Sequence, residues 1–85
     1  MKLQLLYFAR LREALGTDRE EVTLPEGVDD VAALTKWLRA RGGTWSAELA
    51  AGRAYRIAVN QEMAHAGTRL SDGAEVAIFP PVTGG

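Results

Sequence analysis

Apolar residues recur along the chain in short runs with the two-residue period of β-strands. Such runs predict strands at residues 3–8, 21–24, 55–59 and 75–79, and a further short strand is expected at residues 63–64. Residues 3–8 are apolar on nearly both faces, which predicts a central strand that is covered on one face and partly on the other.

One long helix is predicted by apolar residues at helical spacing, namely Val31, Leu34, Leu38 and Trp37. Asp29 or Asp30 is expected to cap its N-terminus, and Gly42-Gly43 is expected to end it.

Two shorter helical segments complete the pattern. Residues 9–15 suit a helical turn ended by Gly16, and Thr44 is expected to cap a short helix that runs through Trp45 to Ala50.

The order of these elements predicts an α+β fold, in which a mixed sheet of about five strands packs on one main helix and one or two short helices. The first and last strands are expected at the centre of the sheet, which is the β-grasp arrangement of ubiquitin. We expect one ubiquitin-like domain over residues 1–81 and a flexible C-terminal tail over residues 82–85.

The composition narrows the possible functions. The 85 residues include no cysteine, so disulfides, thiolate metal sites and a side-chain persulfide are excluded. The net charge is −1 and no basic stripe is present, so neither nucleic acid nor an anionic membrane is an expected partner. No targeting segment precedes the first strand, so we expect a cytoplasmic protein.

Side chains suited to catalysis are scarce. His65 is the only histidine and lies between alanines, which favours a surface or turn residue over a base or ligand. No residue spacing indicates a metal site, so none is predicted. The acidic pairs Glu20-Glu21 and Asp29-Asp30 are interpreted as solvated faces and helix caps. We therefore expect no catalytic machinery within the folded domain.

The candidate for chemistry is the C-terminal carboxylate. The chain ends in Phe79-Pro80-Pro81-Val82-Thr83-Gly84-Gly85, whose last two residues have no side chain. Glycine permits close backbone approach to other atoms, and residues 81–85 could reach roughly 17 Å when extended. An ionised carboxylate is a poor electrophile, so it would require activation, typically as a mixed anhydride with AMP. The activated glycine could then accept an amine or sulfur.

Residues 76–85 resemble the C-terminus of the small, sulfur-carrier subunit of molybdopterin synthase. Residues 5–13 resemble the opening strand and turn of that family, residues 58–63 its middle strand, and residues 70–76 its Asp-Gly turn. The resemblance spans essentially the whole chain, although residues 19–53 match in pattern more than in identity.

The resemblance implies that a ubiquitin-activating-like adenylyltransferase converts Gly85 to an acyl-adenylate with ATP, and that a thiocarboxylate then forms. It implies no tightly bound cofactor. The thiocarboxylate would donate sulfur to a pterin precursor in the active site of the large synthase subunit, within a heterotetramer of two large and two small subunits. The partner-binding residues would be Gly84, Thr83, Val82, Pro81 and Pro80 in the tail, and Phe79, Met63 and Arg12 on the domain.

Three alternatives remain open. A sulfur carrier of the thiamine pathway shares the β-grasp fold and the Gly-Gly end. A ubiquitin-like modifier joined to target lysines is mildly disfavoured because only Lys2 and Lys36 are available for chain building. An interaction domain with an inert tail would leave the tail motif unexplained.

Overall fold

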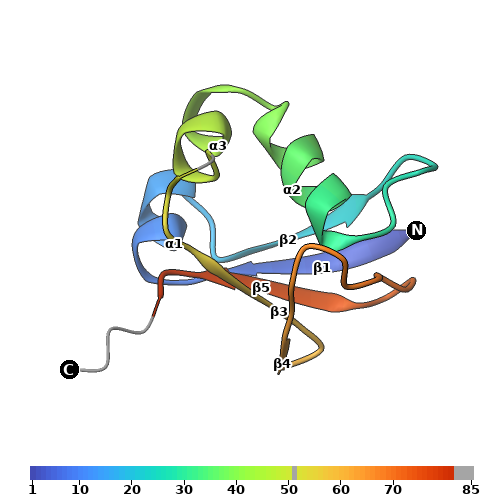
Figure 1. The fold of residues 1–85 in the computed structure, drawn as a ribbon. Helices are drawn as coiled ribbons and strands as arrows, with labels where there is room; N and C mark the ends of the chain where they lie inside the picture. Colours follow the sequence, from blue (N-terminus) through green and yellow to red (C-terminus); the bar gives the residue numbers. More distant parts are fainter. Residues whose placement is uncertain (51, 82–85) are drawn as a thin grey trace.

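The computed structural model describes residues 1–50 and 52–81. In it, a five-stranded mixed sheet forms one layer of the protein (Figure 1). The strand order is β2-β1-β5-β3-β4. The strands are β1 (Lys2–Tyr7), β2 (Arg19–Thr23), β3 (Arg56–Val59), β4 (Glu62–Met63) and β5 (Glu75–Phe79). The pair β1–β5 is parallel and the other three pairs are antiparallel. The first and last strands are thus neighbours within the sheet, as predicted.

Helices α1 (Ala9–Leu15), α2 (Val31–Arg39) and α3 (Gly43–Glu48) all lie on one face of this sheet (Figure 1). The core lies between the two layers, where side chains of β1 and β5 meet those of the helices. The predicted α+β, β-grasp architecture is confirmed. Within the described part of the chain, no helix has the length and apolar character needed to cross a membrane.

Helix α2 forms where the apolar stripe and its cap predicted it. The Asp30 carboxylate accepts a hydrogen bond from the backbone N–H of Ala33 at 2.8 Å, so Asp30, and not Asp29, is the N-cap. Val31, Leu34 and Leu38 are buried against the sheet. The stripe therefore fixes which face of α2 points toward β1 and β5.

The junction of α2 and α3 differs from the prediction. Helix α2 ends at Arg39, and Gly43 begins α3 instead of ending α2. The N-cap of α3 is Gly42 and not Thr44. Gly42 and Gly43 have φ angles of 78° and 53°, which glycine adopts readily. The pair therefore turns the backbone sharply and starts the second helix without a side-chain cap.

Strand β1 follows the expected burial pattern, with one face buried and the other partly buried. Leu3, Leu5 and Tyr7 are buried, whereas Gln4 is exposed and Leu6 is half-buried. The helices cover only the face that carries the first three residues. The second face of the sheet has no covering layer among residues 1–50 and 52–81 (Figure 1).

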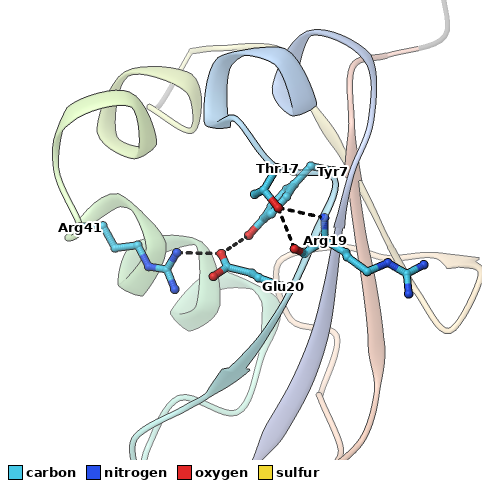
Figure 2. Close-up of polar contacts among 5 residues, drawn as sticks. All are labelled: Tyr7, Thr17, Arg19, Glu20 and Arg41. Carbon is cyan, nitrogen blue, oxygen red and sulfur yellow. Dashed lines mark hydrogen bonds and ion pairs between the residues drawn. The ribbon is translucent and has the colours of Figure 1, made fainter.

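A polar cluster ties the helical layer to the sheet (Figure 2). The Tyr7 hydroxyl donates to Glu20 Oε1 at 2.7 Å, and a guanidinium N–H of Arg41 donates to the same oxygen at 2.8 Å. The Arg41 guanidinium also lies 4.5 Å from the ring centroid of Trp45 and 5.1 Å from that of Trp37. Burial and the neighbouring Glu20 carboxylate raise the pKa of the Tyr7 phenol, so it stays protonated and donates.

Candidate functional site

The uncovered face of the sheet carries a row of apolar side chains. Leu6 pairs with Ala77, Ala77 with Ala58, and Ala58 with Met63. Paired residues on adjacent strands present their side chains to the same face of a sheet. Met63 is 64% exposed, which is unusual for a large apolar side chain.

Two aromatic residues extend this row at the C-terminal end of β5. Phe79 is half-buried and pairs with Arg56. Phe8 is 46% exposed, and its backbone N–H donates to the carbonyl of Ile78 at 3.3 Å. That bond continues the register of β1 and β5 by one residue and sets Phe8 beside Phe79. We call the set Leu6, Phe8, Ala58, Met63, Ala77 and Phe79 the open face.

The chain leaves the sheet directly beside the open face. Phe79 is the last residue of β5, and the half-buried Pro80 and Pro81 follow it. Proline has no backbone N–H, so neither residue can extend the ladder. The predicted carrier and tail residues Gly85, Gly84, Thr83 and Val82 lie outside the described residues.

The structure brings together two of the three domain residues predicted to contact a partner. Phe79 and Met63 share the open face. Arg12 lies instead on α1, exposed, and its backbone carbonyl accepts from the N–H of Gly16 at 3.0 Å. No hydrogen bond or ion pair of the Arg12 side chain is found in the described ranges. A partner role for all three residues stays a prediction.

Sequence reasoning did not identify Leu6 and Phe8 as members of the open face. It assigned both to a strand that is covered on one face and partly on the other. The strict alternation of side chains along a strand could have identified them. Leu5 and Tyr7 face the core, so Leu6 and Phe8 face away from it.

His65 lies in the turn that follows β4. Its imidazole Nδ1 accepts a hydrogen bond from the backbone N–H of Gly67 at 3.1 Å, and its backbone N–H donates to Thr68 Oγ1 at 3.0 Å. The interpretation as a surface turn residue is confirmed. Across residues 1–50 and 52–81, no group of three or more His, Cys, Asp or Glu side chains is placed to hold a metal ion.

Comparison with known proteins places the chain in a family. The ThiS family matches residues 5–85. The molybdopterin synthase sulfur carrier subunit of Escherichia coli is 41% identical over 83 residues, which cover 98% of this chain and 99% of that protein.

Two solved structures share the fold. A putative molybdopterin converting factor, subunit 1, from Pyrococcus furiosus has a TM-score of 0.80 at 32% identity, covering 96% of this chain and 99% of that one. Small archaeal modifier protein 1 of Haloferax volcanii has a TM-score of 0.68 at 26% identity, covering 95% of this chain and 98% of that one. The chain is therefore a member of the ThiS family with the β-grasp fold, and its sequence is similar to those of molybdopterin synthase sulfur carrier subunits.

Proposed function

We propose that this protein is the sulfur carrier subunit of a molybdopterin synthase, with Gly85 as the residue that carries the sulfur. The observation that carries the proposal is the 41% identity to the Escherichia coli sulfur carrier subunit over 83 residues. The tail sequence supports it, because Gly84 and Gly85 offer no side chain that could react or obstruct a narrow active site.

The proposed chemistry takes place at the carboxylate of Gly85 in two steps. One carboxylate oxygen attacks the α-phosphorus of ATP, which releases pyrophosphate and leaves an acyl-adenylate. Hydrosulfide from a sulfide source then attacks the carbonyl carbon and displaces AMP, and loss of the sulfur-bound proton leaves a thiocarboxylate. An adenylyltransferase similar to the ubiquitin-activating enzymes would catalyse the first step, so the chain needs no tightly bound cofactor of its own.

The open face supports a partner-binding role for the domain. Met63 and Phe8 are exposed, and a protein that covered them would remove their apolar surface from contact with water. In the proposal, the large synthase subunit covers the open face, Arg12 contacts its margin, and Val82 to Gly85 enter its active site. There the thiocarboxylate donates sulfur to the pterin precursor, within a cytoplasmic heterotetramer of two large and two small subunits.

Intact mass spectrometry tests the sulfur chemistry directly. The purified chain would be incubated with ATP, the adenylyltransferase and a sulfide source. We expect a mass increase equal to the difference between one sulfur atom and one oxygen atom. The matched control lacks Gly85; it should fold normally but neither gain this mass nor support molybdopterin formation with the large subunit. Molybdopterin formation by the truncated chain would overturn the proposal.

A second function is favoured by one observation, the likeness to small archaeal modifier protein 1 at 26% identity and a TM-score of 0.68. A protein modifier would use the same adenylate but would join Gly85 to a lysine of a target protein. Branched peptides that carry the Gly-Gly end would identify this activity in protein isolated from its own cells. A carrier of the thiamine pathway would form the thiocarboxylate yet fail to support molybdopterin formation with the large subunit.

A further inference from the structure

A groove of about 420 Å³ lies between α2 and β3 at the edge of the sheet, where Val31 and Ile57 of the core and Met63 and Arg56 of the opposite face all line it. Residues 63–66, which comprise the last residue of β4 and the three that follow it, line the groove together with Val31 and Thr35 of α2. The side chains of Val31 and Ile57 give it an apolar floor. A groove of this kind is concave and apolar at its base, as ligand sites usually are.

One margin of the groove is a strand edge without a partner strand. Strand β4 pairs only with Ala58 and Val59, and beyond that pairing Ala64 N–H donates to the carbonyl of Ile57 at 3.0 Å. For the N–H of Ile57, and for the N–H and carbonyl of Tyr55, no backbone partner is found within the part of the chain that the structure describes. By the alternation of an antiparallel ladder, these groups point to the same side as the Ile57 carbonyl, which is the side of the groove.

Apart from the phenol of Tyr55, the ionisable side chains that line the groove are basic, namely Arg39, Arg53, Arg56 and His65. Arg53 donates to Glu48 at 2.9 Å, but the same carboxylate also lies 3.3 Å from Arg10, so two cations share one anion. The Arg53 side chain remains 46% exposed. The groove therefore combines strand-edge donors and acceptors, which have no backbone partner among the described residues, with an excess of positive charge.

We propose that this groove binds an extended acidic peptide of a partner protein, which adds a short strand beside Tyr55–Ile57. The peptide backbone would satisfy the strand-edge groups of Tyr55 and Ile57, as in other cases of strand addition. Alternate side chains would then point toward the floor and toward the arginines. A partner bound here would sit near the base of the tail, because Arg56 pairs with Phe79. The proposal does not depend on what Gly85 carries.

The test is an NMR titration of the full ¹⁵N-labelled chain with the peptide acetyl-Asp-Val-Glu-Val-Asp-amide. We expect saturable shifts and slowed hydrogen exchange at the amides of Tyr55 and Ile57. Arg53→Gln and, separately, Arg56→Gln should each weaken binding about threefold to tenfold, the range for loss of one partly exposed ion pair. Arg19→Gln, on the opposite edge strand, is the matched control and should leave binding unchanged.

Three outcomes would overturn the proposal. A basic peptide, acetyl-Lys-Val-Lys-Val-Lys-amide, could produce the same shifts, which would remove the role of charge. Shifts confined to Leu6, Phe8 and Ala77 would place the peptide on the open face. Inorganic phosphate could reproduce the shifts and displace the peptide, which would make the groove a small-anion site. The spectrum of each variant without peptide establishes that it is folded.

Discussion

At the scale of single residues, the connection between β3 and β4 holds two residues in the left-handed region. Asn60 and Gln61 have φ angles of 50° and 70°, which is the signature of a type I′ hairpin turn. Asn60 is suited to this position, because its backbone N–H donates to the Glu75 carbonyl at 2.8 Å and its Oδ1 accepts from the Glu75 N–H at 3.0 Å. Gln61 has no such compensation among the described residues, so it is the strained member of the turn.

Replacing Gln61 by glycine should therefore stabilise the protein. Glycine removes the left-handed penalty of about 1–2 kcal/mol but adds backbone entropy to the unfolded chain, so the expected net gain is about 0.5–1 kcal/mol. Urea denaturation would measure the free energy of unfolding. Gln61→Ala is the matched control, because it shortens the side chain and keeps the strain. A glycine variant no more stable than the alanine variant would show that the turn is unstrained.

Tyr7 gives a prediction about alkaline pH. Burial and Glu20 raise its pKa in the folded state, whereas the unfolded chain titrates near the ordinary tyrosine value of about 10. The unfolded state therefore releases its proton first as the pH rises. The stability that Tyr7 contributes is fully present below about pH 10 and declines above it.

Tyr7→Phe is the variant that isolates this effect. It should cost about 1 kcal/mol near neutral pH, through loss of the hydrogen bond to Glu20. The difference in unfolding free energy between the natural protein and the variant should then shrink above about pH 10. Denaturation curves at a series of pH values would measure it. A difference that stays constant to high pH would contradict the raised pKa.

At the scale of elements, the sequence predicted the helices and strands that are marked by a pattern of neighbouring residues. The stripe of Val31, Leu34 and Leu38 with an aspartate before it was enough to define α2, and the last strand was predicted at its observed residues. The Gly42-Gly43 pair was misread because glycine after a helix is a common stop signal, and the sequence does not show that a second helix starts on it. Residues 3–8 did not show how much of the second face would stay uncovered, since that depends on where all the helices pack.

Leu38 offers a test of the α2 register. It is fully buried, so Leu38→Ala should destabilise the fold by about 2–5 kcal/mol through lost packing and the cavity that remains. Lys36→Ala, on the exposed side of the same helix, is the control and should stay within about 0.5 kcal/mol. Thermal or urea unfolding would measure both. Equal stability of the two variants would mean that the register is wrong.

At the scale of the whole molecule, the two faces of the sheet differ in what covers them. The helical face is held by the core and by the cluster in which Glu20 joins Tyr7 to Arg41, residues that lie far apart in sequence and that no local pattern connects. The candidate site was predicted only in part for the same reason. Phe79 and Met63 were expected to face a partner, but the contribution of Leu6 and Phe8 depends on strand register, and the groove beside β3 depends on how short β4 is.

The open face provides the last prediction. Met63 is 64% exposed, so Met63→Lys should leave the free energy of unfolding nearly unchanged. If the large subunit covers this face, the new charge is buried there without a counter-charge, and affinity should fall about tenfold or more. Phe79→Lys should have the same effect on binding at a greater cost to folding, because Phe79 is half-buried in the sheet.

Calorimetric titration of each variant against the purified large subunit, with a parallel denaturation curve, separates binding from folding. Ala47→Lys is the matched control, because Ala47 is exposed on α3, on the helical side of the molecule (Figure 1). It should bind like the natural protein. Unchanged affinity in a folded Met63→Lys variant would mean that the partner approaches the tail from another side. An equal loss in Ala47→Lys would mean that charge alone, and not the open face, governs the affinity.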